Sequence, residues 1–255
     1  MMKYYDSLLE MTLFSKQQVN QLVGNADTAK TLLKSYLQHG YIEKIRHNYY
    51  AVKSLDTKQP VPDRFAIASN INEKTYISHH AAFEYYGMTN QVFTEIQVST
   101  SKPFMNFDFD GVRYVCILCK MESGIVSPTS KIRITDIERT IVDNIKDFTK
   151  YGGLEELLRC LSLVTFTDEE KLLVYLNLYD TQFLYQKAGF ILSHYQKSMK
   201  LSEHFFTVCK KETGKSIRYL YDGIQHENPV FYPDWQIYAP ADLLKLIDEG
   251  GEEIV

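Results

Sequence analysis

The sequence predicts an α+β protein in which helices and a hairpin come first, a mixed α/β region follows, and the C-terminal part is mostly helical. Three observations predict this class. Residues 14–52 pass from helical apolar spacing to a pair of strands around a polar tip. Asp110-Gly111 separates two runs of aromatic and β-branched residues, which is typical of a two-residue hairpin. From Gly152 onward, leucines recur at the spacing of helix faces.

The first 54 residues contain the signals of three helices and a hairpin. Ser15 and Gln18 predict a capping box for the second helix, and Gly24 suits its end, where positive φ is needed. Asn25 precedes the third helix, and Gly40 ends it. The apolar faces of the three helices are expected at Tyr4, Tyr5, Leu8, Leu9 and Met11, then Val19, Leu22 and Val23, then Ala29, Leu32, Leu33, Tyr36 and Leu37. With two strands in residues 41–52, this order predicts a winged helix-turn-helix, which places one helix in a DNA groove and a hairpin, the wing, beside the phosphates.

Polar residues on the outer faces of this predicted domain are the candidates for contact with DNA. They are Gln17, Thr28, Lys30, Thr31, Lys34, Ser35, Lys44, Arg46, His47 and Asn48. Thr28, Lys30 and Thr31 lie in the first turns of the third helix, which in this fold points at base edges, and Lys34 is expected at a phosphate. Arg46 is expected at the wing tip, where it can enter a minor groove or hold a phosphate. The alternative is that these residues form only the solvated face of a small helical domain.

Charge is distributed unevenly along the 255-residue chain, whose net charge is −4. Residues 1–54 carry seven Lys and Arg against four Asp and Glu, a net +3, which leaves −7 for the rest. A basic N-terminal part followed by an acidic remainder is typical of a DNA-binding domain joined to a part that does not bind DNA broadly. We therefore expect a DNA-binding domain at 1–54, a polar linker at 55–63 and an α+β domain at 64–255.

The predicted α+β domain combines a small sheet with many helices. Its first helix is expected at 64–70, and the next at 79–86 between a Ser78 cap and Gly87. Ile96 and Val98 share one face of a strand at 94–100, and a capping box from Thr135 to Glu138 opens a helix that reaches residue 147. The remaining elements are strands at 106–109, 112–118 and 131–134, a helical stripe from 154 to 163, helices at 172–178, 183–195 and 203–210, a strand-like piece at 230–238 and a final helix at 241–247.

The apolar content and the cysteines point to a cytoplasmic protein. Hydrophobic residues make up 45% of the chain, but no apolar run approaches the length of about 18 residues that a membrane span needs. The first residues lack the apolar stretch of a signal peptide. Four scattered cysteines are expected to be reduced, and the Cys116/Cys119 pair lacks a second pair of ligands for zinc. Because glycine-rich phosphate loops are also missing from the sequence, we expect neither a metal nor a cofactor.

Three stretches of the sequence together resemble one protein family. Residues 40–52 are similar to its wing, and Ser78 to Gly87 matches an S-x-x-A-A-x-x-x-x-G helix. Glu138 to Asp143, followed by Gly152 to Glu156, matches an E-R-T-x-x-D … G-G-x-E-E segment. The family is that of AbiEi-type antitoxins and transcriptional regulators of bacterial abortive-infection, or type IV toxin–antitoxin, systems. The resemblance covers most of residues 1–165.

The resemblance implies both a DNA partner and a protein partner. It implies a repressor that binds inverted repeats in double-stranded DNA upstream of its own operon. It also implies that the second domain counteracts a nucleotidyltransferase-like toxin, with no stable complex required. Arg139 and Asp143 match motif positions, but at i and i+4 they are expected to pair with each other, or Arg139 to fix a neighbouring loop, and we assign them no catalytic role.

An enzymatic function is the weaker interpretation. Glu95 on a strand, acids such as Asp63 and Glu84, and Lys102 are compatible with a Mg²⁺-dependent nuclease, but alternating exposed residues on an edge strand explain Glu95 and Gln97 equally well. His79 and His80 are adjacent and cannot both bind one metal from a helix. Trp235 is expected in the core or at a domain contact and not on a binding surface. We therefore predict a binding protein with no catalytic residues, and the remaining alternative is a stand-alone regulator whose acidic domain binds a ligand or protein.

Overall fold

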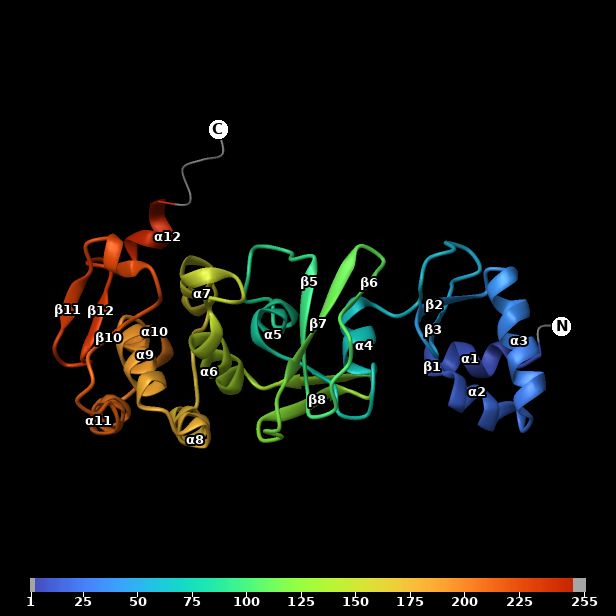
Figure 1. Cartoon of the computed structure of the whole chain (residues 1–255), viewed down its shortest axis with the longest axis horizontal. Helices are drawn as coiled ribbons and strands as arrows, with labels where there is room; N and C mark the ends of the chain where they lie inside the picture. The colour runs from blue at the N-terminus through green and yellow to red at the C-terminus, as the bar shows by residue number, and fades with distance from the viewer. Residues whose placement is uncertain (1–2, 250–255) are drawn as a thin grey trace. The chain divides into compact units, whose positions relative to one another are not determined.

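The computed structural model describes residues 3–249, which form two compact units. The first unit runs to Ile77 and adds Thr94–Lys120 and Ser127–Arg133. The second comprises Ser78–Phe93, Met121–Val126 and the chain from Ile134 onward. Helices and several sheets occur together, which confirms the predicted α+β class (Figure 1). None of the helices in the described part of the chain has the length and apolar content needed to cross a membrane.

The N-terminal module, residues 3–54, contains three helices and a three-stranded antiparallel sheet. Its elements are α1 (Tyr5–Met11), β1 (Leu13–Ser15), α2 (Lys16–Val23), α3 (Ala26–Gln38), β2 (Ile42–Arg46) and β3 (Tyr49–Val52). The strand order is β1-β3-β2. Strand β1 was not predicted, because three residues are too short to show an alternating pattern, and its pairing with β3 comes from distant sequence.

The ends of the module's helices confirm the local sequence signals. Ser15 caps α2, its side chain accepting from the backbone N–H of Gln18 while the Gln18 side chain accepts from the Ser15 N–H. Gly24 ends this helix at φ 77°, a left-handed conformation that glycine adopts without strain. The Asn25 side chain accepts two backbone N–H groups at the start of α3. These caps set the position and direction of α3.

The core of the module forms where the helical stripes meet the sheet. Its buried members are Tyr5, Leu8, Phe14, Val19, Ala29, Leu33, Tyr36, Ile42, Tyr50 and Val52. Three residues assigned to inner faces are exposed instead: Leu9 and Met11 on α1, and Leu37 on α3. A seven-residue helix makes two turns and presents only a narrow face to one side, so the outer part of the apolar stripe on α1 stays in solvent.

The segment expected as a linker, residues 55–63, folds back on the module. Val61 donates its backbone N–H to the carbonyl of Val52, Ser54 donates to Gln59, and Lys53 pairs with Pro60 as an isolated bridge. The two compact units do not divide at this segment, because residues on both sides of it belong to the first unit. Whether residues 1–54 fold as a separate domain therefore stays a prediction.

A six-stranded mixed sheet follows, with strand order β6-β7-β5-β4-β9-β8. Its strands are β4 (Tyr76–Ile77), β5 (Glu95–Thr100), β6 (Phe107–Phe109), β7 (Val112–Leu118), β8 (Ile125–Thr129) and β9 (Ile132–Thr135). Strands β6 and β7 form the predicted hairpin, and Asp110 and Gly111 at its turn have φ values of 50° and 74°. Helix α4 (Arg64–Ser69) contacts β4 and β5, and the Asp63 side chain caps it.

Strand β5 lies inside this sheet, which corrects the expectation of an edge strand. It pairs in parallel with β7 and antiparallel with β4. Ile96 and Val98 are buried as predicted, but Gln97 on the opposite face is also only 4% exposed. Alternation predicts which residues share a face, and neighbouring strands decide whether the second face meets solvent.

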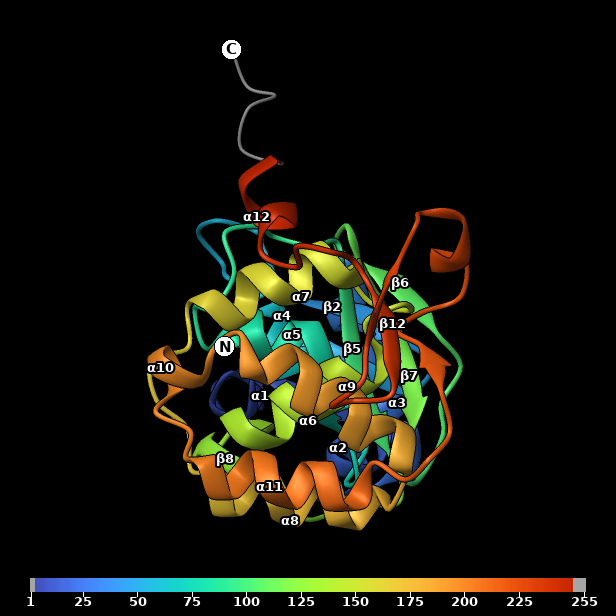
Figure 2. The same ribbon diagram turned by 90° about the vertical axis from the view of Figure 1, so that its left-hand side faces the viewer.

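Helices make up most of the second unit (Figure 2). They are α5 (His79–Tyr85), α6 (Ile137–Asp147), α7 (Gly153–Ser162), α8 (Glu169–Tyr179), α9 (Gln182–Ser193), α10 (Gln196–Met199), α11 (Glu203–Glu212) and α12 (Lys245–Glu249), with a 3₁₀ turn at Ile224–His226. A small sheet, in the order β10-β12-β11, contains β10 (Arg218–Tyr219), β11 (Val230–Tyr232) and β12 (Ile237–Ala239). Helix α6 contacts α5, α7, α8 and α9, so it is the central helix of this unit.

Asp136, not Thr135, caps α6, because its carboxylate accepts the N–H of Arg139 while the Thr135 hydroxyl lies 2.7 Å from the Thr140 hydroxyl. Trp235 is 6% exposed and belongs to the core, as predicted.

Candidate nucleic-acid interface

A hollow of about 440 Å³ lies between α3 and the β2–β3 hairpin. We call it the α3–hairpin groove. Its lining residues are Lys16, Lys30, Leu33, Lys34, Leu37, Gln38, Lys44, His47, Asn48 and Tyr50. Five of the predicted DNA-binding residues, Lys30, Lys34, Lys44, His47 and Asn48, therefore converge on one surface of the first unit.

The local fold explains why these side chains face the groove. Ala29, Leu33 and Tyr36 bury one side of α3, so Lys30 and Lys34 project from the other. On β2, Ile45 points inward and the preceding Lys44 points outward. Asn48 adopts φ 57° at the hairpin turn, a left-handed conformation that asparagine tolerates better than most residues.

The electrostatics of the groove are dominated by cations without partners. Among the residues whose side chains the structure describes, Lys16, Lys30, Lys34 and Lys44 form no ion pair and no side-chain hydrogen bond. The module's ion pair between Lys53 and Glu43, at 3.1 Å, involves residues outside the groove lining. Four ammonium groups along one groove produce a positive potential that attracts a polyanion.

Lys16 is a groove residue that the sequence interpretation missed. Its backbone N–H donates to the carbonyl of Asn48 at 3.1 Å, which ties the first turn of α2 to the hairpin tip. Its position in the first turn of a helix was predictable, since Lys16 directly follows the Ser15 cap. Its proximity to the hairpin was not, because that depends on a tertiary contact.

Five predicted residues lie outside the groove lining. Thr28 and Thr31 are exposed on α3, where the Thr31 hydroxyl donates to the carbonyl of Asp27. Ser35 is half-buried, with its hydroxyl 3.5 Å from the His39 ring. Gln17 faces a second hollow, together with Arg46.

Arg46 is not at the exposed tip of the hairpin, where the sequence placed it. It is the last residue of β2 and half-buried, and its guanidinium lies 5.5 Å from the Phe104 ring and 5.2 Å from the Phe107 ring. The tip itself is His47-Asn48, and both of these residues are exposed. The sequence could not predict this position, because the two aromatic partners are nearly 60 residues away.

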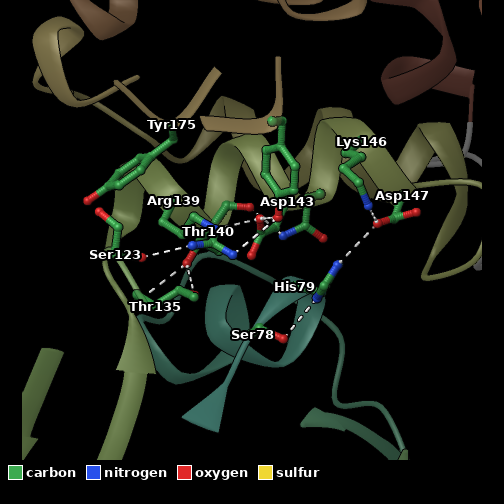
Figure 3. Close-up of polar contacts among 12 residues, drawn as sticks. Ser78, His79, Ser123, Thr135, Arg139, Thr140, Asp143, Lys146, Asp147 and Tyr175 are labelled. Carbon is green, nitrogen blue, oxygen red and sulfur yellow. Dashed lines mark hydrogen bonds and ion pairs between the residues drawn. The ribbon is translucent and has the colours of Figure 1, made fainter. Parts of the chain in front are cut away.

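In the second unit, the motif residues form a buried polar network (Figure 3). Arg139 is fully buried; its Nε donates to Asp143 at 2.7 Å and its Nη1 to the carbonyl of Ser123 at 2.8 Å. Both predicted contacts, the i,i+4 pair and the fixing of a neighbouring loop, are therefore present. Tyr175 donates to the Asp136 carboxylate at 2.7 Å and adds α8 to the same network.

Ser78, His79 and Asp147 lie in a row, as the members of a nucleophilic triad do. The Ser78 hydroxyl is 2.8 Å from His79 Nδ1, and His79 Nε2 is 3.5 Å from the Asp147 carboxylate (Figure 3). Burial opposes ionisation of Asp147, but hydrogen bonds from His79, Lys146 and Lys150 hold its pKa far below the usual range. Ser78 has no exposed surface, whereas a nucleophile must reach its substrate. The geometry therefore fits a structural tie between α5 and α6.

The donor set best suited to a metal in the described part of the chain is His80, Glu156 and Cys160. Their ligand atoms lie within 4.8 Å of one another, and all three residues are buried. His80 Nε2 is 2.8 Å from the Glu156 carboxylate, which also accepts the Thr89 hydroxyl at 2.7 Å. These are hydrogen-bond distances, so the cluster holds together without an ion. Burial raises the pKa of the Cys160 thiol, which keeps it protonated.

Two of the acids considered for a nuclease have structural partners. Asp63 caps α4, and Glu95 accepts from the Gln97 side chain at 3.4 Å. Glu84 belongs to the second unit. No group of three potential metal ligands within the described residues includes any of them, or Cys116 and Cys119.

Comparison with known proteins shows the fold alone. No family model matches the chain, and no curated protein does. The solved structure of the RV2827C protein from Mycobacterium tuberculosis is similar, with a TM-score of 0.67 at 13% sequence identity. The match covers 98% of this chain and 94% of that one. The likeness thus extends over nearly all of the chain.

Proposed function

We propose that this protein binds double-stranded DNA sequence-specifically, with the N-terminal module acting as a winged helix-turn-helix. Helix α3 is the recognition helix in the major groove, and the β2–β3 hairpin is the wing. The observation that carries the proposal is the α3–hairpin groove, in which four lysines without acidic partners face a common space. The order of the elements along the chain, α1, β1, α2, α3, β2 and β3, also supports the proposal.

We propose different tasks for the exposed residues. Thr28 and Thr31 near the start of α3 face base edges, since the N-terminal part of a recognition helix enters deepest. Lys30, Lys34 and Lys44 neutralise phosphates on the two sides of the groove. Lys16 adds a phosphate contact from the start of α2.

The proposed biological role is that of an AbiEi-type antitoxin that represses its own operon. In this role the module binds inverted repeats in its own promoter, and the second unit counteracts a nucleotidyltransferase-like toxin without a stable complex. The support is the order of the motifs at 40–52, 78–87 and 138–156. We propose a binding protein and not an enzyme, since the motif residues Arg139 and Asp143 are buried in contact with each other.

Binding of the upstream DNA tests the proposal. Fluorescence anisotropy with a duplex from upstream of the gene, excess unrelated DNA and Mg²⁺ should show a saturable complex with intact DNA. The variant Lys30→Gln/Lys34→Gln should bind at least about ten-fold more weakly, because it loses two phosphate contacts. Lys53→Gln is the matched control, since Lys53 pairs with Glu43 outside the groove.

Other outcomes distinguish the alternatives. Equal binding by the groove variant and the control variant overturns the proposed interface. Mg²⁺-dependent cleavage of the duplex replaces it with the nuclease interpretation. If a nucleotidyltransferase encoded next to this gene arrests growth, co-expression of this protein should restore growth. DNA binding without such rescue leaves a stand-alone regulator.

A further inference from the structure

A second hollow, of about 600 Å³, shares the hairpin tip with the α3–hairpin groove. We call it the Arg46 hollow. Within the first unit, four segments line it: the start of α2, the hairpin tip, residues 70–73 and residues 102–104. Its volume is within the range of about 300–1,000 Å³ that small-molecule sites occupy.

Arg46 lines the hollow, and its guanidinium makes no hydrogen bond within the described chain. Its Nη1 is buried and has no hydrogen-bond partner among the described residues. The Phe104 and Phe107 rings hold the guanidinium by cation–π contact and restrict its rotation. The other guanidinium nitrogens also make no hydrogen bond within the described chain, and they can donate to an anionic oxygen in the hollow.

The remaining lining offers the groups that a nucleotide requires. Lys102 supplies a second cation, exposed and paired with Glu73 at 3.0 Å. Phe104 supplies an aromatic ring for stacking. Gln17 and Asn48 have side-chain amides that make no hydrogen bond within the described chain, and an amide can pair with the donor and acceptor edge of a base.

We propose that the Arg46 hollow binds a nucleoside monophosphate, with the phosphate at Arg46 and Lys102 and the base on Phe104. His47 and Asn48 line both this hollow and the α3–hairpin groove. A nucleotide in the hollow therefore contacts the same hairpin tip that the DNA needs and changes DNA affinity. This regulatory part rests on the proposed function, whereas the binding of the nucleotide does not.

Calorimetric titration of the full chain tests the binding step directly. The probes are AMP, GMP, CMP and UMP, each alone, and inorganic phosphate. At least one nucleotide should bind saturably with one site. Phe104→Ala should weaken it by about ten-fold, the scale of lost base stacking. Lys102→Ala, on an exposed side chain, should also weaken it and checks the site if Phe104→Ala unfolds. Lys30→Gln, in the other groove, is the control and should leave it unchanged.

Several results would overturn the assignment. They are no binding of any nucleotide up to about 5 mM, binding of inorganic phosphate as tight as that of the nucleotide, or equal weakening by Lys30→Gln. The DNA assay is separate. Nucleotide binding without any DNA binding keeps the site and refutes the proposed function, whereas DNA binding that is indifferent to saturating nucleotide refutes the regulatory link.

Discussion

The salt dependence of DNA binding gives the sharpest test of the α3–hairpin groove. We consider the triple variant Lys30→Gln/Lys34→Gln/Lys44→Gln. Each phosphate contact changes the slope of log K against log salt by about 0.9, so the variant should lower the steepness of that slope by about 2.7. Between 50 mM and 200 mM salt, the wild-type protein should therefore lose about 40-fold more affinity than the variant does. The three lysines make no ion pair within the described chain, so their removal leaves no acid uncompensated.

The assay is fluorescence anisotropy on one duplex at four or five salt concentrations. Glutamine is polar and uncharged, is one atom shorter than lysine and has nearly its helix propensity, so the fold should be retained, which circular dichroism can check. Lys53→Gln serves again as the control and should keep the wild-type slope. A triple variant with the wild-type slope would refute the reasoning, because the groove lysines would then not contact phosphate.

Three further predictions concern the stability of the second unit. Burial lowers the pKa of Lys187 from 10.5 to about 8, which corresponds to about 3 kcal/mol at most. Burial of the charged ammonium destabilises the fold below pH 8, and this destabilisation disappears as the pH rises toward 10.5. Lys187→Met should therefore raise the free energy of unfolding at pH 7, measured by urea denaturation, and lose this advantage above pH 10.5. An added Cβ at Gly189 would lie 2.0 Å from the Trp235 ring, so Gly189→Ala should destabilise by about 1–3 kcal/mol and change the fluorescence of that single tryptophan. Burial tends to raise the pKa of Glu156, but hydrogen bonds from His80 and Thr89 outweigh it and lower the pKa; the wild type should lose stability as the pH falls below about 4.5, and Glu156→Gln should flatten this part of the curve.

Each stability prediction has an outcome that contradicts it. If Lys187→Met is less stable at pH 7, the contacts of the ammonium with the Phe148 and Phe183 rings are stronger than its cost of burial. A Gly189→Ala variant with unchanged stability would mean that Trp235 moves freely. If Glu156→Gln loses unfolding free energy at low pH as steeply as the wild type does, other carboxylates determine the acid sensitivity.

Much of the fold was predictable wherever a signal is local. A helix cap, a turn with positive φ and an apolar stripe each involve residues within a few positions of one another. Ser15 with Gln18, and Asp110 with Gly111, were therefore assigned correctly from sequence. The predicted cap of α6 was wrong by one residue, because Thr135 and Asp136 are both good caps and only the packing decides between them.

Long-range pairing was not predictable in the same way. The neighbours of β5 determine that Gln97 is buried, and nothing within the strand records them. The same limit applies to the candidate site. Lys30, Lys34 and Lys44 follow from the helical and hairpin periods, whereas the burial of Arg46 depends on Phe104 and Phe107 in another part of the sheet region.

The positions of the motif residues bear on where the proposed antitoxin activity can reside. Ser78 and Arg139, which carry much of the resemblance, have no exposed surface, and Asp143 is 1% exposed. They tie α5, α6 and the loop at Ser123 together, so the motif specifies packing within the second unit. Side chains that no partner can reach do not themselves contact a toxin, its target or its product. If the second unit counteracts a toxin, the residues responsible must lie on its exposed surface, and the buried motif residues do not identify them. Substitutions of exposed residues that leave stability intact, and not substitutions in the motif, are therefore the ones that can separate antitoxin activity from folding.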